Sequence, residues 1–277
     1  MSQTPSALMT AEELRPLVGS PGVKILDASY NLPPFSKGIA GAVDFDIDDI
    51  ADPQAPLAHT VPSAELFGEK AGRLGIGNKD MVVVYDRAGI SMAASRAWWM
   101  FRLFGHDNVR ILDGGLPAWV EAGYSLAEKA QPVPASFSAR FRPELLKEAG
   151  DIKENIGAKK FAVLDARDPR RYSGEAPEPR PGMAAGHIPQ SLNVPFMALV
   201  GQDGKLKPAA ELEKIFKSSS VDVKAPVACS CGSGVTACVV ALGLFELGNR
   251  NAAVYDGSWA EWGSDPSLPK KKAGGLL

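Results

Sequence analysis

The sequence Cys231-Gly232-Ser233-Gly234-Val235-Thr236 stands between two apolar segments of the chain. The segment before it, 225–228, is short and typical of a buried strand, and the segment after it, 239–247, is typical of a helix. Its two glycines allow a curled backbone, because glycine adopts positive φ without steric cost. A curled loop at a helix start directs several N–H groups inward, which favours a bound anion. We therefore expect a strand–loop–helix unit that holds the Cys231 sulfur as a thiolate, the nucleophilic form of cysteine.

The composition is ordinary for a globular protein and argues against two classes of partner. The 277 residues suffice for two domains, and 45% of them are hydrophobic and 22% charged. The formal net charge of −2 gives no field that would attract nucleic acid or an anionic membrane. No apolar run approaches the roughly 20 residues of a membrane span. Residues 1–5 lack the basic and apolar segments of a secretory signal, so we expect a cytoplasmic protein.

The three cysteines indicate one functional thiol in a reducing compartment. Cys229 and Cys231 are too close for an ordinary disulfide, and no C-x-x-C pair suggests a metal site, so no metal or organic cofactor is expected. Cys229 and Cys238 read as small apolar fillers of a strand and a helix. A redox role, in which Cys229 resolves an oxidised Cys231, stays open as a second hypothesis.

Four landmarks of the first half recur in the second half, in the same order and at a nearly constant separation. Such recurrence indicates a tandem duplication in which each half has the size of a domain. The pairs are 25–28 (ILDA) with 163–166 (VLDA), 37–39 (KGI) with 186–188 (GHI), 81–86 (MVVVYD) with 225–231 (APVACSC), and 113–119 (DGGLPAW) with 256–262 (DGSWAEW).

Short apolar strands alternate with amphipathic helices in each half, which predicts an α/β fold with a mainly parallel sheet flanked by helices. We expect one such domain over residues 1–130 and a second over 151–277. The intervening residues 131–150 begin with a prolyl, polar stretch and are expected to be a linker. The lysine-rich tail, 270–275, is expected to fray.

Two halves of this kind, with Cys-Gly-Ser-Gly-Val-Thr-Ala in the second, resemble the tandem rhodanese family. Within that family the chain is most similar to the 3-mercaptopyruvate sulfurtransferases, and the likeness covers nearly the whole chain. The resemblance therefore implies two rhodanese-like domains. The motifs that carry it, besides the cysteine loop, are 97–102 (AWWMFR), 112–115 (LDGG), 178–180 (EPR), 186–189 (GHIP) and 256–259 (DGSW).

The resemblance implies a catalytic cysteine at Cys231 and an inactive first half. Asp86 takes the place of the cysteine in the first half, and a carboxylate cannot form a persulfide. Only the second domain is then expected to carry sulfur. The loop amides of Gly232, Gly234, Val235 and Thr236 are expected to cradle the thiolate and the outer sulfur of its persulfide.

A 2-oxo acid donor presents a carboxylate, which a guanidinium binds through two parallel hydrogen bonds. The segment 167–172 carries three arginines, and a fourth follows at Arg180. The resemblance aligns Arg171 and Arg180 with the carboxylate-binding pair of the family. Arg167 and Arg170 have no such counterpart and read as surface or salt-bridge residues.

The resemblance also places Asp48, His59 and Ser233 in a relay beside the thiolate. When a thiolate takes sulfur from 3-mercaptopyruvate, pyruvate leaves as its enolate, and a hydroxyl or imidazolium would stabilise that charge. Of the other two histidines, His106 is expected in a turn and His187 in a structural role.

Three functions compete. The first is transfer of sulfur from 3-mercaptopyruvate, via a Cys231 persulfide, to a thiol such as thioredoxin or to cyanide. The second is thiosulfate sulfurtransfer, which the uncharged Gly232 and Ser233 disfavour, since thiosulfate is a dianion. The third is a non-catalytic module that binds partners or stores persulfide.

A cysteine phosphatase is excluded because Ala237 stands where Cys-x5-Arg requires arginine. A monomer is the expected state.

Overall fold

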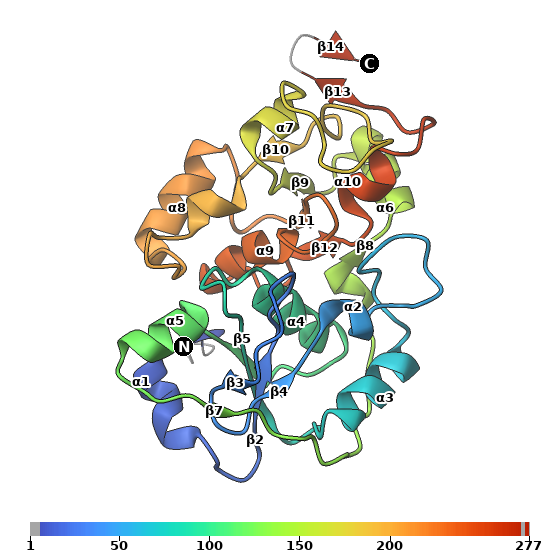
Figure 1. Cartoon of the computed structure of the whole chain (residues 1–277). Coiled ribbons are helices and arrows are strands. Elements are labelled where there is room, and N and C mark those ends of the chain that lie inside the picture. Colours follow the sequence, from blue (N-terminus) through green and yellow to red (C-terminus); the bar gives the residue numbers. More distant parts are fainter. Residues whose placement is uncertain (1–5, 273–274, 277) are drawn as a thin grey trace. The chain divides into compact units, whose positions relative to one another are not determined.

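A computed structural model describes residues 6–272 and 275–276 (Figure 1). The chain forms two compact units that do not follow a single division of the sequence. The first unit contains the described residues up to Gln54, then Val61–Arg142 and Val200–Leu206. The second contains Ala55–Thr60, Pro143–Leu199 and the chain from Lys207 onward. Each unit therefore includes a short segment that lies within the other's stretch of sequence.

The first unit is built on a five-stranded sheet of order β1-β6-β5-β2-β4, in which all pairings are parallel. Helices lie between the strands, as expected for parallel neighbours that need crossover connections. A two-stranded antiparallel ribbon of β3 and β7 stands apart from this sheet. The elements are β1 (Leu8–Met9), α1 (Ala11–Leu14), η1 (Arg15–Leu17), β2 (Val23–Asp27), β3 (Lys37–Gly38), β4 (Val43–Asp44), α2 (Ile47–Ile50), α3 (Ala64–Arg73), β5 (Met81–Tyr85), α4 (Met92–Leu103), β6 (Val109–Leu112), α5 (Gly115–Glu121) and β7 (Ala127–Glu128).

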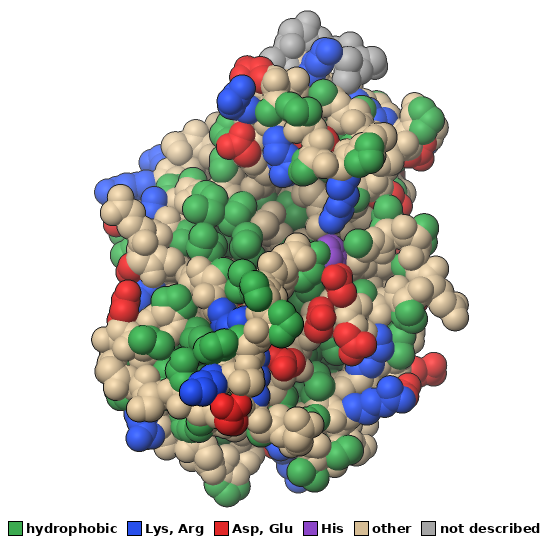
Figure 2. Space-filling model, viewed as in Figure 1, with side chains coloured by type: hydrophobic (Ala, Val, Ile, Leu, Met, Phe, Trp, Pro, Cys, Tyr) green, Lys and Arg blue, Asp and Glu red, His purple; other side chains and the backbone are tan. Residues whose placement is uncertain are grey.

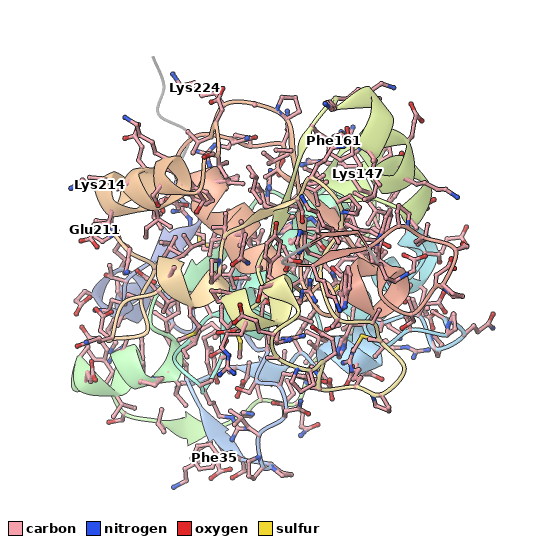
Figure 3. All side chains as sticks on the ribbon, turned by 90° about the horizontal axis from the view of Figure 1, so that it is seen from above. Phe35, Lys147, Phe161, Glu211, Lys214 and Lys224 are labelled. Carbon is pink, nitrogen blue, oxygen red and sulfur yellow. The ribbon has the colours of Figure 1, made fainter. Side chains whose placement is uncertain are left out.

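The second unit has a five-stranded parallel sheet of order β10-β9-β11-β12-β8. At its edge strand β8, the Lys147 ammonium lies 5.6 Å from the centroid of the Phe161 ring, a pair visible in Figure 3. The elements are η2 (Pro143–Leu145), β8 (Leu146–Lys147), α6 (Ala149–Ala158), β9 (Ala162–Asp165), α7 (Pro169–Ser173), β10 (Leu192–Asn193), η3 (Phe196–Leu199), α8 (Ala209–Ser218), β11 (Val227–Ser230), α9 (Ala237–Glu246), β12 (Ala253–Tyr255), α10 (Ser258–Trp262), β13 (Lys271–Lys272) and β14 (Gly275–Leu276).

The two sheets are copies of one another. Read from β8 to β10, the second sheet repeats the order of the first, so that β5 corresponds to β11 and β2 to β9. Asp27 ends β2 and Asp165 ends β9, as the repeated sequence pattern requires. The predicted α/β class and its duplication into two mainly parallel sheets are confirmed.

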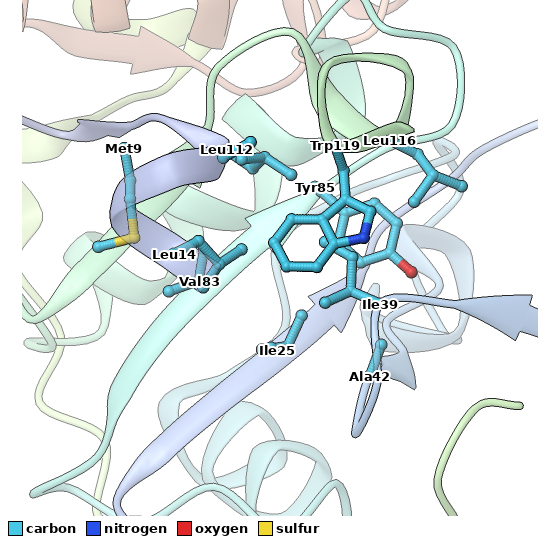
Figure 4. Close-up of a cluster of buried hydrophobic side chains, with 11 residues drawn as sticks. Met9, Leu14, Ile25, Ile39, Ala42, Val83, Tyr85, Leu112, Leu116 and Trp119 are labelled. Carbon is cyan, nitrogen blue, oxygen red and sulfur yellow. The ribbon is translucent and has the colours of Figure 1, made fainter. Parts of the chain in front are cut away.

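Equivalent apolar clusters fill one face of each sheet. In the first unit Leu14 of α1 and Trp119 of α5 pack on Ile25 and Val83 of the sheet (Figure 4). In the second unit Ile152 of α6 and Trp262 of α10 pack beside Val163 and Ala228. The other face of each sheet carries a nearly all-buried helix, α4 or α9. Burial along nearly the whole helix places α4 and α9 inside their units, and it fixes the loop that precedes each helix.

The residues expected to link the halves are ordered against the first unit and the second sheet. Residues 135–137 run so close to α3 that a Cβ at Gly68 or Gly72 would lie within 2.8 Å of a carbonyl oxygen of this segment. Arg140 N donates to Phe104 O over 2.9 Å. Strand β8 and the start of α6 then fall before residue 151. The segment is thus held by backbone contacts along much of its length.

The expectation of a frayed tail is wrong for residues 270–272; residues 273–274 lie outside the described part. Lys270 is buried, and its ammonium donates to the carbonyl oxygens of Asp265 (2.5 Å) and Leu268 (2.9 Å). Lys271 exchanges two backbone hydrogen bonds with His187. The lysine-rich composition did not reveal these acceptors, which are main-chain oxygens.

The charge distribution agrees with the small net charge. On the face shown in Figure 2, basic side chains are scattered among acidic and apolar ones. Among residues 6–272 and 275–276, no helix is long and apolar enough to cross a membrane. Within the same ranges, no group of three or more His, Cys, Asp or Glu side chains is arranged to hold a metal ion.

Candidate active site

Cys231 lies at the carboxyl end of β11, the central strand of the second sheet. Its thiol is reduced and buried. The backbone turns through residues 232–236, with Gly234 at φ +75°, and enters α9 at Ala237. The sequence-based prediction of strand, curled loop and buried helix is confirmed at this point.

Ser258 holds the backbone of Cys231 through contacts that the sequence did not reveal. Its buried hydroxyl accepts a hydrogen bond from Cys231 N (3.0 Å) and donates one to Tyr255 O (2.7 Å). Trp259 N donates to Cys231 O (3.0 Å), so both backbone groups of the cysteine are bonded. Ser258 has φ +49°, a conformation that is costly for a residue with a Cβ. The motif around it was recognised, but no sequence signal marks a left-handed serine.

One pocket of about 280 Å³ gathers most of the predicted substrate-binding residues. Its volume is near the lower end, about 300 Å³, of small-molecule sites. Gly234 belongs to the loop, and the pocket is lined by its neighbours. The lining residues are Arg171, Pro179, Arg180, Met183, Cys231, Gly232, Ser233, Val235 and Thr236. The structure thus places a thiol and two guanidinium groups around a single hollow of the second unit.

Arg171 reaches this pocket from a buried ionic network. Its Nη2 donates to Glu178 Oε2 over 2.6 Å, and a Cβ at Gly232 would lie 3.3 Å from the same nitrogen. Glu178 also accepts from Arg167 Nη1 (2.8 Å), and Arg167 is paired with Asp165 (2.7 Å). Of the two roles expected for Arg167, a surface residue or a salt-bridge residue, the structure shows the salt bridge. The side chain is buried. No role for Glu178 follows from the sequence pattern alone.

The members of the predicted relay lie in different segments. Ser233 lines the pocket. His59 is buried in the segment Ala55–Thr60 of the second unit and has φ +65°. Asp48 is exposed in the first turn of α2 in the first unit, where its N–H donates to Asp46 Oδ1 (2.9 Å). The relay of Asp48, His59 and Ser233 stays a prediction.

The other two histidines pack as structural residues. His187 stacks on Tyr172 with 3.9 Å between ring centroids, and its Nδ1 lies 2.7 Å from Tyr172 O. His106 lies among Phe101 and Phe137. Burial lowers the pKa of both imidazoles and so favours their neutral form.

Cys229 and Cys238 are buried, in agreement with a filling role. Burial raises the pKa of the Cys229 thiol well above its ordinary value. A thiol that resists ionisation is a poor nucleophile, which argues against Cys229 as a resolving residue. The Cys238 sulfur lies 3.3 Å from Gly234 O and so supports the loop.

In the first unit, Asp86 occupies the position that corresponds to Cys231. Its carboxyl is buried, and burial raises its pKa to about 7, against the opposite effect of hydrogen bonds from the N–H groups of Ala94, Ala88 and Gly89. A loop of amides therefore surrounds an acidic group here as well. The group is a fixed side chain and has no transferable atom.

A hollow of the first unit, lined by Arg87 next to Asp86 in the sequence, differs in its charged groups from the pocket around Cys231. It measures about 650 Å³, and its lining includes Asp27, Asp44, Asp46, Arg87 and Lys129. The Lys129 ammonium is held between Asp27 (2.7 Å) and Asp44 (2.5 Å). Acidic groups outnumber basic ones among these residues, so this hollow is not a counterpart of the arginine-lined pocket.

Comparison with known proteins identifies the family of the chain. A model of the rhodanese-like domain matches residues 10–122 and 148–265. The chain is 44% identical to human 3-mercaptopyruvate sulfurtransferase over 269 residues, which cover 93% of this chain and 90% of the human one. It is 40% identical to rat thiosulfate sulfurtransferase over 263 residues, which cover 91% and 89% of the two chains.

Solved structures of similar proteins have the same fold. The structure of SseA from Escherichia coli, a 3-mercaptopyruvate sulfotransferase, superposes with a TM-score of 0.82 at 36% identity, covering 92% of this chain and 99% of SseA. Tum1 from Saccharomyces cerevisiae superposes with a TM-score of 0.86 at 29% identity, covering 98% and 99%. Both likenesses extend over the two units together.

Proposed function

Because the chain belongs to the rhodanese-like family, with one matching domain in each half, we propose that it is a 3-mercaptopyruvate sulfurtransferase. The observation that carries this proposal is a buried, reduced cysteine that shares one small pocket with two arginines. The relatives named 3-mercaptopyruvate sulfurtransferase, which match along most of the chain, support the choice of donor.

The first half-reaction transfers one sulfur atom to Cys231. The thiolate attacks the donor's sulfur, an S–S bond forms, and the donor's C–S bond breaks with its electron pair on carbon. The product at carbon is the enolate of pyruvate. The proton that the donor thiol carried moves to this carbon, which leaves pyruvate and a Cys231 persulfide anion.

The second half-reaction returns the enzyme to its thiolate form. An acceptor thiolate, such as that of thioredoxin, or cyanide attacks the outer sulfur of the persulfide. The S–S bond breaks, its electron pair returns to the Cys231 sulfur, and the acceptor leaves with the sulfur atom. The curled amides of Gly232, Gly234, Val235 and Thr236 stabilise the anion in both resting states.

Arg171 and Arg180 bind the donor carboxylate in this mechanism. Their place in the lining of the pocket supports this role, since guanidinium groups recognise carboxylates through paired hydrogen bonds. Ser233, which lines the same pocket, stabilises the enolate oxygen, and His59 and Asp48 are the other two members of the proposed relay.

The first domain, 1–130, carries no sulfur, and the second domain, 151–277, performs the chemistry. The buried carboxyl of Asp86 supports this division. We also propose a reducing compartment such as the cytoplasm, because a chain with only three cysteines, clustered within ten positions, is not built on a disulfide framework. The protein acts as a monomer.

Mass spectrometry of the intact protein tests the proposal. After exposure to 3-mercaptopyruvate, the chain gains the mass of one sulfur atom, and the Cys231→Ser variant does not. The absence of pyruvate release would favour the alternative of a non-catalytic carrier.

Thiosulfate sulfurtransfer is the second candidate, because a relative at 40% identity bears that name. The loop residues Gly232 and Ser233 are uncharged, which favours a donor with a single carboxylate. The ratio of kcat/KM for the two donors decides between them, and a clear preference for thiosulfate would reverse our choice.

A further inference from the structure

Glu178 is a carboxylate buried between two arginines, one of which lines the active-site pocket. Its side chain is 1% exposed. Oε1 accepts from Arg167 Nη1 at 2.8 Å and from Arg171 Nε at 3.3 Å, and Oε2 accepts from Arg171 Nη2 at 2.6 Å. Both oxygens are therefore engaged, and the carboxylate grips one edge of the Arg171 guanidinium.

Arg167 anchors Glu178 to the sheet. Its Nε and Nη2 donate to the carboxylate of Asp165, the last residue of β9, and Nη2 also donates to Gly186 O over 2.8 Å. The guanidinium carbon lies 4.3 Å from the centroid of the Trp259 ring. The side chains of Asp165 and Arg167 are 2% and 1% exposed, so this end of the network is rigidly packed.

The four side chains balance in charge. Two carboxylates, Asp165 and Glu178, face two guanidinium groups, Arg167 and Arg171. Removal of one member of a buried ionic cluster leaves an uncompensated charge, which is costly. Only Arg171, with a side chain 27% exposed, meets the pocket. The network therefore presents a guanidinium to the donor and cancels most of its long-range charge.

We propose that Glu178 is a positioning residue, which fixes the Arg171 guanidinium for the donor carboxylate and sets the net charge of the pocket. This inference rests on the proposed sulfur transfer from 3-mercaptopyruvate. A guanidinium is planar and rigid, so a grip on the Nε–Nη2 edge also fixes where Nη1 lies. The N–H groups of Arg171 Nη1 then point in one fixed direction, where they can bind the carboxylate of the donor.

The variant Glu178→Gln removes one negative charge and keeps the volume of the side chain. We expect KM for 3-mercaptopyruvate to rise about tenfold, as for the loss of one oriented charge-assisted hydrogen bond, while kcat changes less than threefold. The pocket also gains one positive charge, which favours a dianion. The ratio of kcat/KM for 3-mercaptopyruvate to kcat/KM for thiosulfate should therefore fall at least threefold.

Two further variants make the measurement decisive. Glu178→Asp keeps the charge but shortens the side chain and so misplaces the Arg171 guanidinium; its KM should rise while its donor ratio stays near that of the wild type, and an unchanged KM would count against the positioning role. Glu154→Gln breaks the exposed pair with Lys160, whose side chains are 68% and 69% exposed, and should leave KM and the donor ratio unchanged. Denaturant unfolding of each variant verifies that the assays use folded protein. If Glu178→Gln does not fold, Glu178→Asp carries the test through its raised KM and retained donor ratio.

The outcomes separate this inference from the function beneath it. If the wild type gains no sulfur from 3-mercaptopyruvate, the proposed function fails. If the wild type turns over and Glu178→Gln retains both its KM and its donor ratio, the positioning role is overturned. A loss of kcat alone, equal for both donors, would likewise assign Glu178 to stability and overturn the proposal.

Discussion

The loops after β5 and β11 hold the same place in two copies of one sheet, yet one bears a carboxyl and the other a thiol. The backbone around them is retained. Leu116 N donates to Asp86 O over 2.9 Å, and Trp259 N donates to Cys231 O over 3.0 Å. The duplicated fold thus supplies the same frame for two different acidic groups.

The residues that precede Leu116 and Trp259, namely Gly115 and Ser258, show how the two copies diverged. Gly115 has φ +59°, and a Cβ there would overlap the Asp86 carbonyl oxygen, so only glycine fits. Ser258, at the corresponding position, has φ +49° and uses its hydroxyl to hold Cys231 N. The copy that carries Cys231 therefore accepts backbone strain at a residue that holds this cysteine, whereas the copy that carries Asp86 avoids it.

The largest expected effect comes from removing the thiol. Cys231→Ser should lower pyruvate release from 3-mercaptopyruvate by at least about 10³-fold, because a hydroxyl cannot form a persulfide. Steady-state assays measure the loss, and far-UV circular dichroism verifies the fold. Cys229→Ala is the matched control, and it should remain active.

The same experiment can be carried into the first copy. Asp86→Cys in the Cys231→Ser background should not restore pyruvate release, because the hollow lined by the adjacent Arg87 also carries Asp27, Asp44 and Asp46, which repel the donor carboxylate. Recovery of turnover in this double variant would mean that the loop alone makes the site.

The next effect concerns stability and pH. The pKa of Asp86 is raised to about 7 in the folded state from 3.8, so between these values the unfolded chain loses a proton that the folded chain keeps. Stability is then greatest below the unfolded pKa and falls as pH rises, by up to about 4 kcal/mol in total. Asp86→Asn, neutral at every pH, should not show this loss.

Urea unfolding of both proteins at pH 5, 6, 7 and 8 measures the difference. The gain in unfolding free energy of the Asn variant over the wild type should grow up to about pH 7 and then level off. Parallel curves for the two proteins would show that the Asp86 carboxyl is ionised throughout.

A smaller effect is expected from Arg180, for which we propose a role in binding the donor carboxylate. Arg180→Ala should raise KM for 3-mercaptopyruvate about 10- to 100-fold through loss of a charge-assisted contact. The kcat should change less if the contact is equally strong in the ground and transition states. An unaltered KM would remove Arg180 from the binding site, and Arg170→Ala, on an exposed neighbour, serves as the control.

The smallest effect is expected when Ser258 is replaced by glycine, the residue at the corresponding position of the first copy. Ser258→Gly loses both hydrogen bonds of the buried hydroxyl, at about 1 kcal/mol each, and relieves a left-handed residue, which recovers about 1 kcal/mol. The free energy of unfolding should therefore change by no more than about 1 kcal/mol. Turnover should fall about three- to tenfold, because Cys231 is held less accurately. Ser258→Ala, which keeps the strain, should be less stable than Ser258→Gly.

The sequence predicted the features that depend on local patterns. The strand, glycine-containing loop and buried helix around Cys231 follow from residues close together in the chain, and so do the two copies of the sheet. Arg171 and Arg180 followed from the family likeness, and both line the pocket.

The features that escaped prediction depend on contacts between distant residues. Glu178 stands in a recognised motif, yet only the fold reveals that its two oxygens join Arg167 to Arg171. Ser258 gives no sign in the sequence of its positive φ. The buried position of Lys270 could not be predicted, because its acceptors are main-chain carbonyl oxygens. Every residue type has such an oxygen, so the sequence does not indicate which ones the lysine contacts.

The exchange of short segments between the units bears on how such a protein can be dissected. Val200–Leu206 belongs to the first unit, where Leu206 N donates to Asp113 Oδ1 over 2.9 Å, although it lies far along the second half of the chain. A fragment that stops at Arg142 would lack this segment, and a fragment that starts there would lack Ala55–Thr60. What began as a repeated module can therefore no longer be separated by a single cut.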